Sequence, residues 1–135
     1  MGRILGLDVG ERRIGVAIST PEGGLAIPLR VLERRDLAAD LAAIASLARE
    51  EGIEALVIGH PLSMSGAAGQ QAHRVEGFAQ QLAKATGLRY ELWDERLSSV
   101  QAERSVGPAR GRRRGPADDV AAAIILQSYL DRQRA

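Results

Sequence analysis

Five acidic residues lie at the ends of apolar segments, where their carboxylates could bind a metal ion. They are Asp8, the pair Asp94 and Glu95, and the pair Asp118 and Asp119. Strand carboxyl ends and helix amino ends gather at one edge of a parallel α/β sheet, where ligands bind. Carboxylates brought together there would repel one another unless a cation neutralised them. Mg²⁺ and Mn²⁺ prefer oxygen ligands, so the pattern predicts a site for one of these cations.

Each acidic residue also has a purely structural explanation. Asp8 could shape a turn, since aspartate favours turn positions. Asp94 and Glu95 could form the solvated end of a strand, and Asp118 and Asp119 could complement a helix dipole. Helical spacing does not choose between the last two, because each shares a stripe with apolar residues. The metal hypothesis therefore rests on the positions taken together.

The other reactive side chains support alternative chemistries less well. His60 and His73 have no histidine four residues away, and we interpret them as structural or surface residues. Gly10 and Gly15 have P-loop spacing, but Val16 occupies the position of the required lysine. The serines lack a His–Asp arrangement for nucleophilic catalysis. The chain has no cysteine, which excludes disulfides, cysteine-bound zinc and thiol catalysis.

Basic residues are concentrated in one stretch, although the net charge is only +1. Residues 96–116 contain one acidic residue, Glu103, and six arginines, which are Arg96, Arg104, Arg110, Arg112, Arg113 and Arg114. Such a surplus can bind a polyanion, but it is equally typical of a solvated loop. Arg12 and Arg13 are further candidates for phosphate contacts, because they follow the predicted ligand Asp8.

The hydrophobic pattern predicts the element order β-β-β-α-β-α-β-α-α. Strands are expected at 3–9, 14–19, 25–32, 54–59 and 88–93, with a turn at 10–13. Helices are expected between Asp36 and Gly52, around 75–82 before Gly87, after Ser98, and from Pro116 to about Asp131. A meander followed by βα units gives a mixed sheet with helices on its faces, with later strands parallel to the first. Pro28 places the third strand at an edge or a bulge.

The composition is that of an ordinary globular protein. The chain has 135 residues, of which 45% are hydrophobic and 26% charged, and no linker divides it. We therefore expect one domain over residues 1–135. The longest apolar run, 120–126, is too short to cross a membrane, and Asp8 interrupts any signal peptide early. These features, with the absence of cysteine, are compatible with the cytoplasm.

Four motifs resemble those of a known family and occur in the same order. They are Gly-Leu-Asp-Val-Gly at 6–10 with Ile-Gly-Val-Ala at 14–17, Gly-His-Pro-Leu-Ser-Met-Ser-Gly at 59–66, Asp-Glu-Arg-Leu-Ser-Ser at 94–99, and Asp-Asp-Val-Ala-Ala-Ala-Ile-Ile-Leu at 118–126. The set resembles the bacterial YqgF family, also called RuvX, of Holliday junction resolvases. Members are also described as pre-16S rRNA nucleases. His60 departs from the family, which usually has an apolar residue before Pro61.

The resemblance implies an α/β, RNase H-like fold, with a mixed five-stranded sheet and helices on both faces. It implies a nuclease that hydrolyses phosphodiester bonds with the help of Mg²⁺ or Mn²⁺ carried by Asp8, Glu95 and Asp118. In such sites two cations can activate the attacking water and stabilise the leaving oxygen. Arginine suits phosphate because its guanidinium binds it bidentately. Phosphate contacts are expected from Arg12, Arg13, Arg96, Arg110, Arg112, Arg113 and Arg114.

The expected substrate is structured nucleic acid: the 5′ end of pre-16S rRNA, a Holliday junction, or both, with the ribosome as a further candidate partner. Trimming one rRNA end needs only a monomer, whereas two symmetrical cuts in a junction favour a homodimer. Two alternatives stay open. The chain could be a non-catalytic rRNA-binding ribosome-assembly factor with a vestigial metal site. It could instead be an actin-like phosphate-binding domain, although such proteins need two domains around their cleft.

Overall fold

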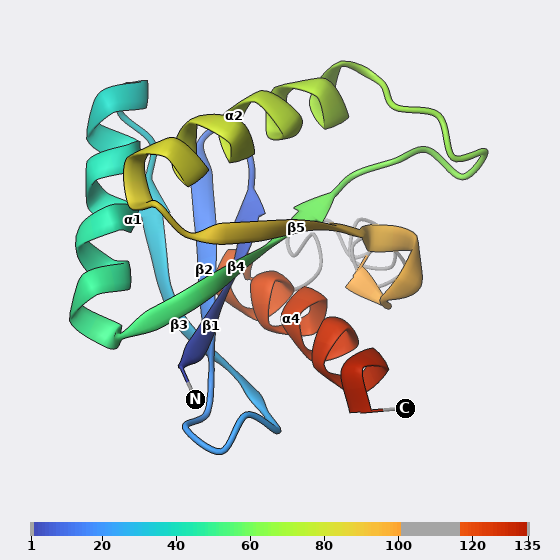
Figure 1. Cartoon of the computed structure of the whole chain (residues 1–135). Coiled ribbons are helices and arrows are strands. Elements are labelled where there is room, and N and C mark those ends of the chain that lie inside the picture. The colour runs from blue at the N-terminus through green and yellow to red at the C-terminus, as the bar shows by residue number, and fades with distance from the viewer. Residues whose placement is uncertain (1, 101–116, 135) are drawn as a thin grey trace.

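The computed structural model describes residues 2–100 and 117–134, and a single five-stranded sheet forms its centre (Figure 1). The strands are β1 (Arg3–Val9), β2 (Arg13–Ser19), β3 (Ala26–Glu33), β4 (Ile53–His60) and β5 (Arg89–Asp94). Their order in the sheet is β3-β2-β1-β4-β5. The first three pair antiparallel, while β4 runs parallel to β1 and β5 parallel to β4. The predicted mixed sheet is confirmed, and each strand end lies within one residue of its predicted position.

Helices cover both faces of the sheet, as predicted. On one face lie α1 (Leu37–Glu51) and α2 (Gln70–Thr86), and on the other lies α4 (Asp118–Arg134) (Figure 1). A short 3₁₀ helix, η1 (Glu95–Leu97), follows β5. The predicted helix after Ser98 falls mostly on residues outside the described ranges, as does Pro116. Among the helices of residues 2–100 and 117–134, none is long and apolar enough to cross a membrane.

The ends of α1 and α2 follow from residues visible in the sequence. The Asp36 side chain accepts a hydrogen bond from the Ala39 N–H at 2.8 Å, which satisfies a free donor at the start of α1. Gly52 and Gly87 end the two helices with φ of 65° and 73°, a left-handed conformation that glycine adopts without strain. The three predicted boundaries at Asp36, Gly52 and Gly87 are therefore confirmed.

Pro28 lies in β3, and the structure confirms both expectations for this strand. Among the described strands, β3 lies at the edge of the sheet and pairs with β2 alone. Its register with β2 shifts between Val16 and Ala17, which pair with Arg30 and Pro28. Proline has no N–H to donate to a neighbouring strand, so it is tolerated at an edge or a bulge.

Alternate residues of the central strands face two separate apolar cores. Leu5 and Leu7 of β1 pack in the core that contains the buried side chains of α1 and α2. Ala17 of β2 and Val57 of β4 pack in the core that contains those of α4. Because side chains alternate along a strand, Asp8 belongs to the face that α4 covers.

Glycines on the α4 face let backbone and side chains come very close to the sheet. A Cβ atom at Gly6 would lie 2.7 Å from the Leu126 Cβ, and one at Gly15 would lie 1.9 Å from the Asp118 carbonyl oxygen. At Gly59 it would lie 2.7 Å from Glu95 Oε2. The three central strands β2, β1 and β4 therefore each lack a side chain where α4 or Glu95 comes closest.

Gly15→Ala should destabilise the fold, because the new methyl group would overlap the backbone of Asp118. Overpacking of this kind costs about 1–3 kcal/mol, and backbone yields less readily than a side chain. Gly77→Ala is the control, because nothing lies within 4 Å of a Cβ at this α2 position. Alanine there should stabilise the helix by about 0.5–1 kcal/mol. Urea denaturation measures both, and wild-type stability in Gly15→Ala would contradict the close packing.

Candidate active site

The carboxyl end of β1 lies between two glycines on the face covered by α4. Asp8 of β1 pairs with Gly15 of the neighbouring strand β2. On its other side, Gly59 follows the last β4 residue that pairs with β1. The backbone of Asp118 lies over Gly15, and the carboxylate of Glu95 lies over Gly59. The topology thus brings three acidic residues from distant parts of the sequence to one edge of the sheet.

One pocket of about 350 Å³ joins these residues. It is lined by Asp8, Val9, Gly10, Pro61, Gln71, Glu95 and Asp118. Asp8 and Glu95 are buried, with 6% and 3% of their surfaces exposed, whereas the Asp118 side chain is 32% exposed. Asp94 and Asp119 do not line this pocket.

The donor set of the pocket fits a hard divalent cation by residue type and position. It offers carboxylate oxygens, and a cation would relieve the repulsion between buried acidic groups. Within residues 2–100 and 117–134, however, no three acidic or histidine side chains already converge as a metal-binding group. The Asp118 carboxylate is paired with Arg13 instead, at 2.8 Å between Nε and Oδ2. One predicted ligand therefore has another partner.

Arg12 and Arg13, both predicted to contact phosphate, line a second pocket of about 350 Å³ beside the first. The two pockets share Gly10, Gln71 and Asp118. Arg13 was expected in the turn after β1, but it is the first residue of β2 and pairs with Glu33. The hydrogen bond and the charge of Asp118 raise the pKa of Arg13, which stays charged. A pocket lined by both arginines, together with the acidic Glu11 and Asp118, thus adjoins the acidic one.

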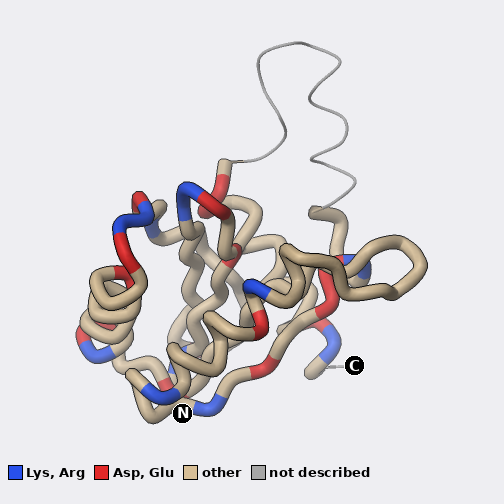
Figure 2. The backbone as a smooth tube through the Cα atoms, turned by 90° about the horizontal axis from the view of Figure 1, so that it is seen from above, with Lys and Arg blue, Asp and Glu red and all other residues tan. Residues whose placement is uncertain are grey.

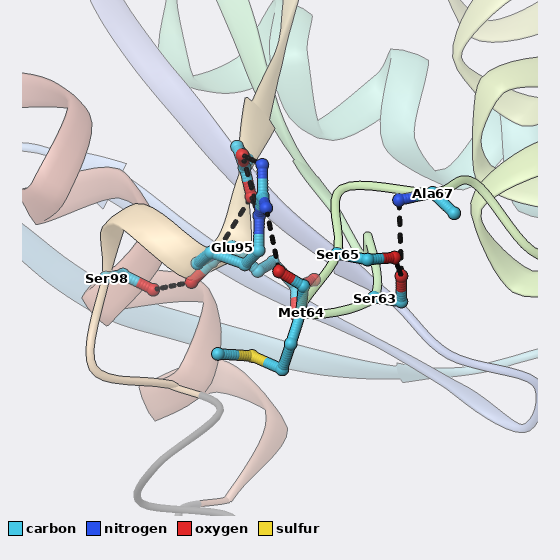
Figure 3. A network of polar contacts seen from close by, with 8 residues as sticks. Ser63, Met64, Ser65, Ala67, Glu95 and Ser98 are labelled. Atoms are coloured by element: carbon cyan, nitrogen blue, oxygen red, sulfur yellow. Dashed lines mark hydrogen bonds and ion pairs between the residues drawn. The ribbon is translucent and has the colours of Figure 1, made fainter.

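Arg96, also predicted to contact phosphate, is held by Asp94. Its Nη2 lies 2.6 Å from Asp94 Oδ2, and its Nε donates to both carboxylate oxygens. The hydrogen bonds of Arg96 lower the pKa of Asp94. Arg96 Nη1 also donates to the carbonyl of Met64 at 3.3 Å, which ties η1 to the loop after β4 (Figure 3). A structural role for Asp94 and Arg96 is therefore visible.

The position of Glu95 is fixed through its backbone. The Ser98 hydroxyl and the Ser98 N–H both donate to the Glu95 carbonyl, at 2.9 and 3.1 Å (Figure 3). The nearby loop is closed by Ser63, whose hydroxyl lies 2.9 Å from that of Ser65 and accepts from the Ala67 N–H (Figure 3). These serines act as local hydrogen-bonding groups, which agrees with the absence of a catalytic triad in the sequence.

Gln71 is a pocket residue that sequence reasoning missed. It lies in the first turn of α2, and its side-chain N–H donates to the Val9 carbonyl at 3.1 Å. Gln71 lines both pockets. Nothing in its residue type or spacing marks it as functional, because a glutamine at a helix start is common on protein surfaces.

His60 and His73 share one partner, Glu76 of α2. His60 Nε2 lies 2.7 Å from Glu76 Oε2, and His73 Nδ1 lies 3.0 Å from Glu76 Oε1. The interpretation of both histidines as structural or surface residues agrees with these contacts. Hydrogen bonds from His60 and then His73 lower the pKa of Glu76. The group joins the end of β4 to α2, on the face opposite α4.

Glu76→Gln should reduce stability in a pH-dependent way. The pKa of Glu76 in the folded protein lies below its ordinary value of 4.5. The interaction therefore stabilises the protein above this value and is lost as the pH falls through the lowered pKa. Urea denaturation should show the largest deficit near neutral pH and a shrinking one in acid. Glu22→Gln is the control, and a deficit that persisted unchanged in strong acid would contradict the assignment.

The arginines Arg110, Arg112, Arg113 and Arg114 lie outside the described residues. Over the described part of the chain, basic and acidic residues are interspersed (Figure 2). Several of the basic groups there are paired with carboxylates, including Arg13 with Asp118 and Arg96 with Asp94.

Fold and site together define the class of protein. The structure of Thermus thermophilus RuvC in complex with a Holliday junction substrate matches with a TM-score of 0.64, covering 100% of this chain and 97% of that one at 14% identity. The yeast mitochondrial Holliday junction resolvase Ydc2 matches with a TM-score of 0.51, covering 98% and 79% at 16% identity. At these identities the likeness shows the fold alone, which is that of the RNase H-like nucleases.

The sequence comparisons are more specific. The family described as RuvX, Holliday junction resolvase, matches residues 2–132, so the chain belongs to the RuvX family, also called YqgF. A relative from Moorella thermoacetica is 50% identical over 96% of this chain and 95% of its own length. One from Myxococcus xanthus is 45% identical over 98% and 89%. Both carry the name "Putative pre-16S rRNA nuclease".

Membership of this family makes the chain a nuclease, an enzyme that hydrolyses phosphodiester bonds. The expected RNase H-like fold and the resemblance to the YqgF family are confirmed. The alternatives of a non-catalytic assembly factor and of an actin-like domain lose their support accordingly.

Proposed function

We propose that this nuclease cleaves structured nucleic acid at the pocket formed by Asp8, Glu95 and Asp118, with Mg²⁺ or Mn²⁺ bound to their carboxylates. The observation that carries the proposal is that these three acidic residues, from three separate segments, line one pocket at the sheet edge. When bound, the cations supply an activated water molecule and neutralise the charge of the reacting phosphate.

The protein's own residues orient and hold the substrate. Asp8 and Glu95 are buried and held by β1 and η1, so their carboxylates have little freedom to move. Arg12 and Arg13 line the adjoining pocket, where they would hold a neighbouring phosphate of the backbone. Arg96 would contact phosphate only by sharing its guanidinium with Asp94. Phosphate contacts by Arg110, Arg112, Arg113 and Arg114 stay predictions from the sequence.

Processing of the 5′ end of pre-16S rRNA is the substrate choice that we favour. It is supported by relatives of that name that match almost end to end. Contacts to phosphate carry no base identity, so selectivity would come from the shape of the nucleic acid. This function would place the enzyme in the cytoplasm with the ribosome as a partner.

Holliday junction resolution is the second candidate. The family description and the fold shared with a junction-bound RuvC support it. Cleavage assays with Mn²⁺ on a precursor rRNA fragment and on a synthetic four-way junction distinguish the two substrates. Symmetrical resolution would also require a dimer, which sedimentation would detect.

Asp8→Asn, Glu95→Gln and Asp118→Asn should each reduce cleavage by at least about a hundred-fold. Metal-assisted charge stabilisation supplies several kcal/mol of barrier lowering, and each 1.36 kcal/mol corresponds to a factor of ten. Asp119→Asn is the matched control, since Asp119 does not line the pocket. Cleavage rates with Mn²⁺ measure the effect. Near wild-type activity of Asp8→Asn would contradict the proposed site.

Mn²⁺ should raise the melting temperature of the wild-type protein but not that of a variant with all three carboxylates replaced. A ligand that binds only the folded state adds about 2.7 kcal/mol of stability when its free concentration is 100 times its Kd. Thermal scans with and without Mn²⁺ test this directly. Equal shifts in both proteins would indicate nonspecific ion effects.

A further inference from the structure

The ion pair between Arg13 and Asp118 joins two groups that would each bind a different partner in the proposed function. Asp118 is a proposed metal ligand, and Arg13 is a proposed phosphate contact. Their side chains are 49% and 32% exposed, so both can exchange partners with solvent or solutes. Exposed ion pairs stabilise proteins little, because water and salt compete with them. The pair is therefore strong enough to set the resting conformation and weak enough to be replaced.

The backbone on both sides of this ion pair is fixed. Arg13 and Gly15 are two residues apart on β2, so both face α4. The Asp118 backbone lies against Gly15, where not even a methyl group would fit. A change of partner would therefore come from rotation of the side chains rather than from movement of α4.

Asp118 lines both pockets, so a rotation of its side chain would affect each of them. Asp118 lines the first pocket with Asp8 and Glu95, and it also lines the second pocket, where Glu11, Arg12 and Arg13 supply the other charges. While its carboxylate is bound to Arg13, three acidic side chains do not converge as a metal-binding group among the described residues. The Arg13–Asp118 ion pair thus engages both a proposed metal ligand of the first pocket and a cationic side chain of the second.

We propose that Arg13 is a positioning residue that holds Asp118 out of the metal site until the phosphate backbone of the nucleic acid takes over the Arg13 guanidinium. This inference rests on the proposed function. The phosphate replaces Asp118 as the partner of Arg13, and Asp118 is then free to turn towards Asp8 and Glu95. Binding of metal and binding of nucleic acid are therefore coupled, and the coupling is reciprocal.

The test uses nucleic-acid affinity in the absence of metal. Asp118→Asn removes the internal competitor for Arg13, so a short RNA duplex should bind about five-fold or more tightly, the lower end of typical coupling. Asp119→Asn is the charge-matched control, because it removes one negative charge at the neighbouring position without touching the ion pair. Fluorescence anisotropy of the labelled duplex, in chelator, measures all affinities.

A double-variant cycle assigns the effect to Arg13. In an Arg13→Gln background, Asp118→Asn should change RNA affinity no more than Asp119→Asn does. Circular dichroism checks that each variant is folded. Equal gains from Asp118→Asn and Asp119→Asn in the wild-type background would overturn the proposal, since only general charge repulsion would then be at work.

Mn²⁺ titrations by calorimetry separate this inference from the proposed function. Arg13→Gln should bind Mn²⁺ more tightly than Arg12→Gln, which removes the same charge from the same pocket. If Asp118→Asn leaves Mn²⁺ affinity unchanged, the proposed metal site itself is wrong. If Asp118→Asn weakens Mn²⁺ binding but Arg13→Gln and Arg12→Gln behave alike, the metal site stands and the role of Arg13 is wrong.

Discussion

The contact of α4 with the bare backbone of β2 is the constraint on which the site depends. A helix normally rests on the side chains of a sheet, but here the first turn of α4 lies on Gly15 itself. Gly15 pairs with Asp8, so this contact sets Asp118 beside the carboxyl end of the central strand. Any larger residue at this position would lift the helix and separate the two carboxylates. Gly59 has the same function for Glu95 on the other side.

This close packing brings carboxylates near one another, and Arg13 offsets part of their repulsion. Asp8 and Glu95 are buried at the edge of the same pocket, and a third carboxylate there would add to their repulsion. Pairing of Asp118 with Arg13 reduces this repulsion when no cation is bound. In the proposed metal-bound arrangement, the Asp118 carboxylate would leave Arg13 and turn towards Asp8 and Glu95.

Most of the fold was predictable because it depends on local pattern. Alternation and apolar runs identify the five strands, Asp36 and Gly52 bound α1, and Pro28 identifies an edge strand. The choice between Asp118 and Asp119 could not be derived from helical spacing, because both stripes are apolar. In the structure, Asp118 packs on Gly15 and lines the pocket with Asp8 and Glu95, whereas Asp119 does not line it. A glycine inside a strand is a sequence signal for such an approach.

The partners of the site residues were not predictable, because they lie far apart in sequence. Arg13 and Asp118 are separated by 105 residues, and His60 and Glu76 by 16. A search for histidine pairs could not find a glutamate shared by two histidines.

The same limitation affects the interpretation of basic residues. Seventeen of the eighteen basic residues are arginines, and the cluster of six in residues 96–116 suggested a phosphate-binding surface. In the structure, however, Arg96 binds Asp94, and Arg34 binds Asp40 while donating to the Gly10 carbonyl at 2.9 Å. Arg34 thereby holds the turn that carries Arg12. A planar guanidinium can bind a carboxylate and a carbonyl at once, which a lysine ammonium does with less directionality. Arginine content therefore overstates the surface available to nucleic acid, because some of the arginines are bound to the protein's own carboxylates.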